Sequence, residues 1–477
     1  MQIQDLSLLS KFPAVDEKAV HALLQMQIDQ DHHKLVVLDD DPTGVQTVHD
    51  VSVYTTWDQE AIRQAFAEKQ KVFYILTNTR GMTAAEAAQV NREIAQTVSR
   101  VSRETGKPYL FLSRSDSTLR GHYPLETQVL REEMESDGLY VSGEIMAPFF
   151  LEGGRYTIDN IHYVRQGDVL VPAGDTEFAK DKTFGYSHSS LPEYIEEKTG
   201  GAYRAEDVTC ISLEDLRALR LDKIEAQLLS VENFGKVCVN AVDYVDLEVF
   251  SIALYRAMKK GKAFLFRTAA GLVKVLGGIP DAPLLTREEL IPRQTGCGGL
   301  VVIGSHTEKT TAQLQELLKL EGVEAIAFDS NKILEGPDAL DAEVNRCVAR
   351  EEEIIRSGKT AVCYTCRQLL SLETDTKEAA LLRSIRISDG VQSLVSRLKV
   401  TPAFLIAKGG ITSSDIGTKA LAVRRANVMG QIRPGIPVWQ TGEESRFPQI
   451  PYVIFPGNTG SVEDLRLSVQ TLTGTEA

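Results

Sequence analysis

Three short apolar runs in the first 125 residues each end in a compact polar loop, and this recurrence constrains the fold most. The runs Lys34–Leu38, Val72–Leu76 and Tyr109–Leu112 have the length and continuous apolarity of buried strands. The segments between them are long enough for helices, which favours parallel strands. Parallel strands bring their carboxyl ends to one edge of the sheet, where open α/β folds bind ligands. The sequence therefore predicts an α/β fold whose first three loops share an edge.

The loops at this edge carry carboxylates, hydroxyls and arginines. Asp39–Gly44 follows the first run, Thr77–Gly81 the second and Ser113–His122 the third. Arginine presents a planar fork to a carboxylate or phosphate, and aspartate accepts hydrogen bonds from hydroxyls. A solvated acidic turn or an internal ion pair would explain any one loop, but three together favour a binding edge. The converging side chains are Asp40, Asp41, Arg80, Arg114, Asp116 and Arg120.

Two local patterns are expected around these loops. Thr83 and Glu86 have capping-box spacing and predict the start of a helix that Gly106 can end. Residues 156–171 are typical of a hairpin, and the α/β alternation resumes near Val208, Lys236 and Ala263.

The length of 477 residues predicts two or three domains. Prolines and glycines gather between Gly277 and Gly299, which indicates a boundary. We expect an N-terminal domain at residues 1–280, a linker at 281–298 and a C-terminal domain at 299–477. Strand-like runs resume after the boundary at Leu300–Ile303, Ala403–Ala407 and Tyr452–Phe455.

The loops after these later runs are rich in glycine, serine and threonine. They are Gly304–Thr307, Lys408–Asp415 and Pro456–Gly460. Thr307 is an expected helix N-cap, and Ser461–Asp464 has capping-box spacing. Ordinary glycine turns would explain each loop alone, but such loops also allow backbone N–H groups to approach a phosphate. The chain has neither a Walker P-loop nor a dinucleotide-binding glycine pattern after a strand.

Composition and short sequence patterns argue against several classes of protein and of site. The formal net charge of −14 disfavours nucleic-acid binding, and no apolar run is long enough to cross a membrane. The first residues lack the basic and apolar regions of a signal peptide, which predicts a cytoplasmic protein. The only CxxC pattern, Cys363–Cys366, lies in an apolar run, which favours buried strand cysteines over a zinc or redox site. His188 is expected at the surface.

Eight short motifs occur in a shared order and together suggest a family. They are Asp40–Gly44, Thr77–Arg80, Asp116–Gly121, Ala147–Pro148 with Gly154–Arg155, Asp175–Asp181, Gly304–Ser305, Gly409–Gly410 with Thr412, and Pro456–Asn458. With them the chain resembles the four-carbon acid sugar kinase family, long described as a domain of unknown function, over nearly its whole length. The sequence from Asp116 to Gly121 is the most specific of these motifs.

The resemblance implies two α/β domains, each with a largely parallel sheet flanked by helices, and an active-site cleft between them. It implies an enzyme that uses ATP to phosphorylate a tetronate or 3-oxo-tetronate, and we expect Mg²⁺ to accompany the ATP. The residues that the resemblance places around the acid sugar are Asp40, Asp41, Arg80, Arg114 and Asp116. Thr43 and Arg120, in the same loops, are our further candidates for binding the acid. The residues that the resemblance places at the nucleotide are Ser305, Gly409, Gly410, Thr412 and Gly457. Lys408 and Asn458, in the same loops, are our further candidates for nucleotide binding. Asp116 or Asp41 would orient or deprotonate the acceptor hydroxyl, and Arg114 or Arg120 would neutralise charge.

Two positions depart from the family pattern and leave alternatives open. Phe455 stands where the family often has lysine, and Ile411–Asp415 differs from the usual residues after the paired glycines. A kinase of a branched or five-carbon oxo-acid is one alternative, and a non-catalytic sensor of sugar acid and nucleotide is another. The expected partners are a sugar acid and ATP, without nucleic acid or membrane, and a homodimer is one expected assembly.

Overall fold

The computed structural model describes residues 2–475 except 293–294, 369, 371 and 373–376, so part of the expected linker lies outside it. The chain forms two compact units. The first unit comprises Met1–Gly44 and Thr56–Asp281, and the second comprises Val45–Thr55 and Ala282–Ala477. Residues 45–55 therefore form an excursion of the chain into the second unit. The domain boundary expected from the sequence, at residue 280, places these residues in the N-terminal domain instead.

The main sheet of the first unit has seven strands, and every neighbouring pair in it is parallel. In spatial order the strands are β10 (Thr209–Ile211), β11 (Gly235–Val239), β6 (Gly143–Ala147), β12 (Phe264–Thr268), β5 (Tyr109–Arg114), β2 (Lys34–Asp39) and β4 (Val72–Leu76). The parallel sheet expected from the apolar runs is confirmed. Strands β2, β4 and β5 are buried along their whole length, which explains why these runs are continuously apolar.

Strand β5 is longer than the sequence indicated. Ser113 and Arg114 were expected in a loop, but they continue the ladder opposite Leu38 and Asp39 of β2 and Arg267 and Thr268 of β12. A strand with a neighbour on each side keeps its backbone hydrogen bonds even where its side chains are polar. The loop therefore begins at Ser115.

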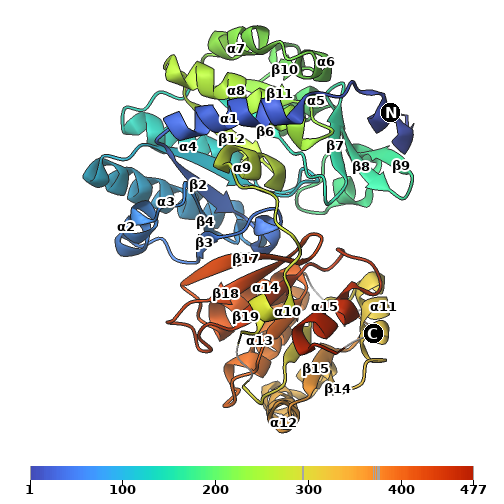
Figure 1. The fold of residues 1–477 in the computed structure, drawn as a ribbon. Helices are drawn as coiled ribbons and strands as arrows, with labels where there is room; N and C mark the ends of the chain where they lie inside the picture. Colours follow the sequence, from blue (N-terminus) through green and yellow to red (C-terminus); the bar gives the residue numbers. More distant parts are fainter. Residues whose placement is uncertain (1, 293–294, 369, 371, 373–376, 476–477) are drawn as a thin grey trace. The chain divides into compact units, whose positions relative to one another are not determined.

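Helices in two groups cover the first-unit sheet (Figure 1). One group consists of α1 (Glu17–Gln30), α6 (Leu213–Arg217), α7 (Leu221–Ser230), α8 (Tyr244–Lys259) and α9 (Ala270–Gly277), and the other of α2 (Gln59–Ala67), α3 (Ala84–Thr105) and α4 (Leu125–Ser136). The expected capping box is confirmed at α3, where Thr83 and Glu86 exchange hydrogen bonds and Gly106 adopts a left-handed conformation.

A small antiparallel sheet accompanies the main one. Its order is β1 (Gln4–Asp5), β9 (Val169–Pro172), β8 (Ile161–Gln166) and β7 (Arg155–Ile158). The hairpin expected at 156–171 is confirmed as β7 and β8, with β9 added to it. Short 3₁₀ segments and α5 (Leu191–Lys198) follow β9 along the chain.

The second-unit sheet is mixed. Its order is β3 (Val51–Tyr54), β17 (Arg425–Arg433), β18 (Ile436–Thr441), β19 (Pro451–Phe455), β16 (Leu405–Lys408), β13 (Leu300–Ile303), β15 (Thr360–Thr365) and β14 (Val323–Phe328). The five strands from β19 to β14 are parallel, whereas β3, β17, β18 and β19 pair antiparallel. The excursion at 45–55 supplies β3, which is paired with β17.

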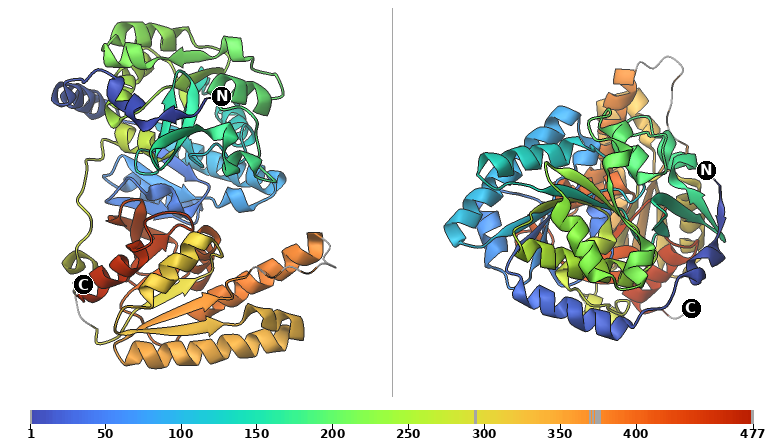
Figure 2. Two further views of the ribbon diagram at one scale, coloured as in Figure 1. Left: turned by 90° about the vertical axis from the view of Figure 1, so that its right-hand side faces the viewer. Right: turned by 90° about the horizontal axis from the view of Figure 1, so that it is seen from above.

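The helices of this unit include two long ones that pack together, α12 and α13 (Figure 2). The bounds are α10 (Arg287–Leu290), α11 (Glu308–Leu317), α12 (Pro337–Arg356), α13 (Lys377–Ser396), α14 (Gly410–Asp415), a π-helix (Ile416–Ala420) and α15 (Asp464–Thr473). Thr307 caps α11 as expected. The last helix starts at Asp464, later than expected, and Asp464 accepts a hydrogen bond from the Ser461 N–H. In the described residues no helix has the length and apolarity of a membrane span.

Candidate functional site

The predicted convergence of the first three loops is present in the first unit. Asp40, at the end of β2, receives two hydrogen bonds from Arg80, at 2.5 Å to Oδ1 and 3.2 Å to Oδ2. Ser115 Oγ, after β5, donates to Asp40 Oδ2. Arg80 Nη1 also lies 3.3 Å from Asp41 Oδ2. One arginine from the β4 loop thus joins both carboxylates of the β2 loop.

Asp41 and Asp116 are the most accessible of the predicted carboxylates, with 17% and 13% of their side chains exposed, against 3% for Asp40. Asp41 accepts hydrogen bonds from the Thr43 hydroxyl and N–H at 2.6 and 2.8 Å. Asp116 Oδ2 accepts from Arg120 Nε at 2.7 Å and from the Thr118 hydroxyl.

Both accessible carboxylates are ionised at neutral pH. Burial alone would raise the pKa of Asp41, but the charge of Arg80 and the Thr43 hydrogen bonds lower it overall. Burial also opposes ionisation of Asp116, and the charges of Arg80 and Arg120 outweigh it and lower the pKa of Asp116 well below its usual range. Charged carboxylates at this edge can accept hydrogen bonds from substrate hydroxyls.

Arg114 occupies a different place from the one expected. Its side chain is buried at the end of β5, and Nη1 lies 3.1 Å from Asp39 Oδ1. Burial raises the pKa of Asp39 to about 7, while the Arg114 charge opposes the rise. A Cβ at Gly44 would lie 1.9 Å from Asp39 Oδ2, so the glycine leaves the room this carboxylate fills. The Asp39–Arg114 pair lies behind the loops and holds the strand ends together.

Side chains from several elements fix the loop after β5. Each of four consecutive carbonyls accepts a side-chain hydrogen bond at 2.7–2.8 Å. The pairs are His162 Nε2 to Ser117, Tyr186 hydroxyl to Thr118, Tyr194 hydroxyl to Leu119 and Arg267 Nη2 to Arg120. Burial lowers the pKa of His162 to about 4, so its ring is neutral at physiological pH. The loop that carries Asp116 and Arg120 is therefore fixed at four successive residues by the surrounding elements.

Sequence reasoning missed several residues of this cluster. Glu126 of α4 accepts a hydrogen bond from the Thr79 hydroxyl at 2.6 Å, and burial raises its pKa. Arg267 is buried at the end of β12, the neighbour of β5. The available signal for Arg267 was its position at the carboxyl end of an apolar run, as for the three loops already identified.

The glycine-rich loops of the second unit also converge. A Cβ at Gly409 would lie 3.3 Å from both Ser305 Cβ and Thr412 Oγ1, and one at Gly457 would lie 3.3 Å from Ser305 Oγ. The loops after β13, β16 and β19 therefore meet around Ser305. Gly409 has φ 124°, a conformation that side chains disfavour. Gly410 begins α14, and Asn458 accepts at its carbonyl from Lys309 Nζ at 3.2 Å.

Lys408 lies beneath these loops. Its side chain is buried, and Nζ donates to the carbonyls of Pro456 and Gly457 at 2.5 and 3.1 Å. The ring of Phe455 lies 4.2 Å from Nζ. Burial, with the nearby charge of Lys309, lowers the pKa of Lys408 to about 7. Lys408 thus ties the loop after β19 to the end of β16.

Hydroxyls that the sequence reasoning missed complete this region. Thr310 Oγ1 lies 3.0 Å from Ser305 Oγ and 3.1 Å from the Gly457 carbonyl. Arg367 Nη2 donates to the Ser305 carbonyl at 2.6 Å. Thr310 could have been found from its position one helical turn after the N-cap Thr307, whereas Arg367 carries no sequence signal of this kind.

The other sequence candidates were the two cysteines of the CxxC pattern and His188. Cys363 is buried in β15 and Cys366 follows it, and in the part of the chain that the structure describes no group of three metal-ligating side chains forms a site. His188 is exposed, as expected, and pairs with Glu197 at 2.7 Å.

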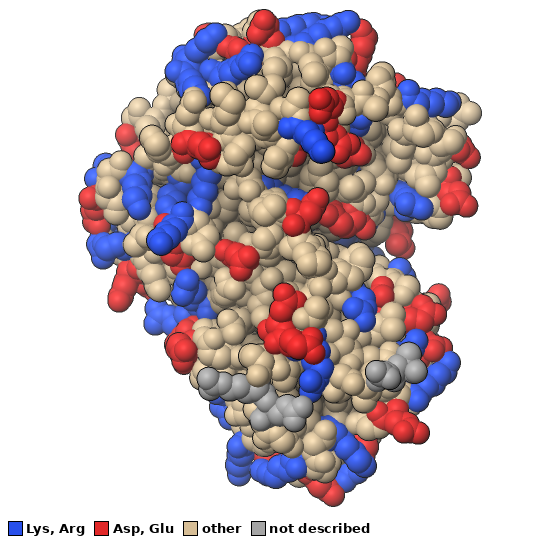
Figure 3. All heavy atoms as spheres, viewed as in Figure 1, with Lys and Arg blue, Asp and Glu red and all other residues tan. Residues whose placement is uncertain are grey.

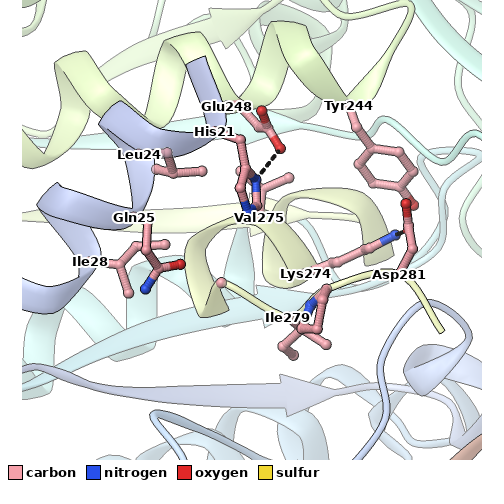
Figure 4. A pocket seen from close by; sticks show the side chains of 12 residues that line it. His21, Leu24, Gln25, Ile28, Tyr244, Glu248, Lys274, Val275, Ile279 and Asp281 are labelled. Carbon is pink, nitrogen blue, oxygen red and sulfur yellow. Dashed lines mark hydrogen bonds and ion pairs between the residues drawn. The ribbon is translucent and has the colours of Figure 1, made fainter. Parts of the chain in front are cut away.

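A separate hollow in the first unit contains none of the predicted site residues. It has a volume of 110 Å³ and lies between α1, α8, α9 and residues 278–281 (Figure 4). Leu24, Ile28 and Val275 line it together with two ion pairs, His21–Glu248 and Lys274–Asp281. The charged groups that line it already pair with one another, so the hollow gives no indication of a charged ligand.

Charged side chains are intermixed on the surface that Figure 3 shows. Among the described residues on this face, lysines and arginines alternate with acidic residues, without a broad basic area.

Both halves of the chain match known domain families. Residues 35–276 match the sugar-binding N-terminal domain family, and residues 300–465 match the nucleotide-binding C-terminal domain family. No curated protein sequence matches the chain.

Solved structures share the fold. A Salmonella typhimurium LT2 protein described as a tRNA synthase superposes with a TM-score of 0.65 at 16% identity, over 91% of this chain and 98% of that one. Haemophilus influenzae protein HI1011, of the DUF1537 family, superposes with a TM-score of 0.58 at 17% identity, over 92% and 100%. The whole length of this chain, apart from short segments, thus has a known architecture.

Proposed function

This chain belongs to the four-carbon acid sugar kinase family, and we propose that it transfers the γ-phosphoryl group of ATP to a terminal hydroxyl of a small sugar acid. The acid would be a four-carbon tetronate or 3-oxo-tetronate. The observation that carries the proposal is the convergence of Asp40, Asp41, Arg80 and Asp116 at one sheet edge of the unit that matches a sugar-binding domain. Accessible carboxylates beside fixed arginines suit a polyhydroxy anion.

The nucleotide would bind to the loops around Ser305 in the second unit. Gly409, Gly410 and Gly457 allow close approach of the backbone, and Ser305 and Thr412 add hydroxyls. Lys408 would hold the loop after β19 in position and add positive charge when protonated. These features support phosphate binding without a Walker sequence.

Magnesium would enter as part of the MgATP substrate. Mg²⁺ in such sites keeps several waters and takes phosphate oxygens as ligands, so it requires no protein cage. The hydroxyl-rich donor set of the second-unit loops fits a phosphate-bound ion of this kind. When bound, the ion neutralises charge on the phosphates.

In the proposed reaction, the hydroxyl oxygen of the acid forms a bond to the γ-phosphorus while the bond to the β-phosphate oxygen breaks, and ADP leaves. Asp116 or Asp41 accepts the hydrogen bond of the attacking hydroxyl and then its proton. Since the pKa values of both are lowered, their main contribution is orientation, which is the dominant requirement in phosphoryl transfer. Arg80 and Arg120 keep the two carboxylates in place.

A coupled ADP-release assay with MgATP and a panel of four- and five-carbon sugar acids tests the proposal. We expect ADP formation that depends on one or a few four-carbon acids. Preferential turnover of a branched or five-carbon oxo-acid would keep the kinase activity but replace the four-carbon acid as the substrate. Saturable binding of acid and ATP without turnover would instead favour a non-catalytic sensor.

A further inference from the structure

The arginines of the first-unit cluster differ in whether a carboxylate already neutralises them. Arg80 pairs with Asp40 and Asp41, Arg114 with Asp39, and Arg120 with Asp116 and, at 3.6 Å, with Asp181. An anionic substrate that bound to one of these would have to compete with an existing partner. A cation without such a partner would bind the anion more readily.

Arg155 is such a cation. It begins β7, where its backbone pairs with Phe150, and its guanidinium Nη1 donates to the Gly153 carbonyl. Its Nε is buried without a hydrogen-bond partner, and in the described residues no carboxylate lies within ion-pair distance of it. The side chain as a whole is only partly buried, so a ligand can approach it.

Arg155 lies beside the predicted acid site. Its guanidinium carbon is 5.6 Å from the centre of the Phe178 ring, and that of Arg120 is 5.1 Å from the centre of the same ring. Burial lowers the pKa of Arg155, and the charges of Asp116 and Arg120 act on it in opposite directions. The two guanidinium groups are therefore held near one aromatic ring and next to Asp116.

Arg267 also lacks an ion pair among the described residues, but its position is different. It is buried, and its Nη2 donates to the Arg120 carbonyl from behind the loop. Its guanidinium carbon lies 5.9 Å from the Tyr123 ring. Arg267 is thus committed to holding the loop, whereas Arg155 has an unused donor and partial exposure.

We propose that Arg155, with Arg120 beside it at Phe178, binds the carboxylate of the acid substrate and so makes the enzyme specific for acids over neutral polyols. This inference rests on the proposed function and adds a residue to it. A guanidinium offers two parallel N–H donors to a carboxylate, and stacking on Phe178 limits the entropy lost on binding. The carboxylates Asp41 and Asp116 would then contact the hydroxyls of the same molecule.

The test compares Arg155→Met with the wild type on the acid identified by the panel and on its neutral amide. We expect kcat/KM for the acid to fall about 100-fold or more, mainly through KM, while kcat/KM for the amide changes less than about threefold. Arg155→Lys keeps the charge without the fork and should recover part of the loss. Calorimetric titration with the acid alone should show the same loss of affinity without requiring turnover.

Arg131→Met is the matched control. Arg131 also stacks on a phenylalanine, at 4.8 Å from the Phe234 ring centre, but it already pairs with Glu135 at 3.1 Å. Its substitution should leave KM for the acid unchanged. If Arg155→Met does not fold, Phe178→Leu and Arg155→Lys test the same role of Arg155. Both should lower the ratio of kcat/KM for the acid to kcat/KM for the amide.

The outcomes separate this inference from the proposed function. Wild-type turnover of acids with an unchanged acid KM and acid affinity in Arg155→Met would overturn the role of Arg155 and leave the kinase intact. A fall in kcat alone would do the same, because it would place Arg155 at the transferred phosphoryl group. Absence of turnover by the wild type with every acid would contradict the kinase, and the titration would still decide whether Arg155 binds acids.

Discussion

The two candidate binding regions lie at corresponding places, the carboxyl ends of parallel strands, but their chemistry differs. In the first unit, Asp40, Arg80 and Asp116 belong to a network of paired charges held by side chains from surrounding elements. In the second unit, glycines and hydroxyls surround Ser305, and one buried lysine lies beneath them. The first arrangement suits a small anion with several hydroxyls, and the second suits a larger phosphate chain contacted by backbone.

Removing the charge of Asp116 should abolish the contribution of the first region to catalysis and leave nucleotide binding by the second region unchanged. We expect Asp116→Asn to lower kcat at least about 1,000-fold, because the acceptor hydroxyl loses its orienting carboxylate. ATP affinity, measured by titration, should stay within about twofold of the wild type. Asp168→Asn, at an exposed aspartate of the same unit, is the control and should leave kcat and ATP affinity unchanged. Turnover like that of the wild type would remove Asp116 from the mechanism.

Adding a side chain at Gly409 should weaken nucleotide binding by the second region and leave acid binding by the first region unchanged. Alanine at φ 124° costs about 1–3 kcal/mol, so the loop should move and ATP affinity should fall about tenfold or more, with acid affinity unchanged. Gly322→Ala carries similar backbone strain at φ 79° in open space of the same unit and is the control. Loss of ATP affinity in both variants would indicate general destabilisation of the unit.

The buried lysine gives the second region a pH dependence of its own. Since the pKa of Lys408 is lowered to about 7, its charge is present below pH 7 and is lost above it in the free protein. Nucleotide binding should then take up a proton, and ATP affinity should fall about fivefold from pH 6.5 to 8.5. Lys408→Met should bind more weakly and with a flat profile. A wild-type profile equally flat would exclude this role.

A buried carboxylate away from the loops should affect stability without affecting binding. Burial raises the pKa of Glu351 in α12 to about 8 from 4.5, so the folded state holds a proton that the unfolded state releases between these values. Stability should therefore fall as pH rises through this range, and Glu351→Gln should remove at least about 1 kcal/mol of that fall. Urea unfolding at pH 5 and pH 8 measures the difference. Equal pH dependence in both proteins would contradict the assignment.

Much of the fold follows from local sequence. Continuous apolar runs identified β2, β4, β5 and the later strands because buried parallel strands are apolar on both faces. The capping box at Thr83 identified the start of α3 because it uses residues three apart. The same reasoning could not find β3 in the second unit, since its pairing with β17 joins residues more than 370 positions apart.

The candidate sites were predictable in part for the same reason. Parallel topology alone brings Asp40, Arg80 and Asp116 to one edge, and their convergence was predicted. Which arginines are already neutralised depends on side-chain direction: Arg114 stays in the strand and turns to Asp39, while Arg155 has no such partner. Sequence spacing contains no information on these pairings.

Phosphorus NMR of the full chain incubated with MgATP and the acid found by the panel tests the central claim most directly. The account predicts a new phosphomonoester signal coupled to the protons of a terminal carbon, formed in equal amount with ADP. Formation of inorganic phosphate alone, or unchanged ATP in the presence of every acid, would contradict it.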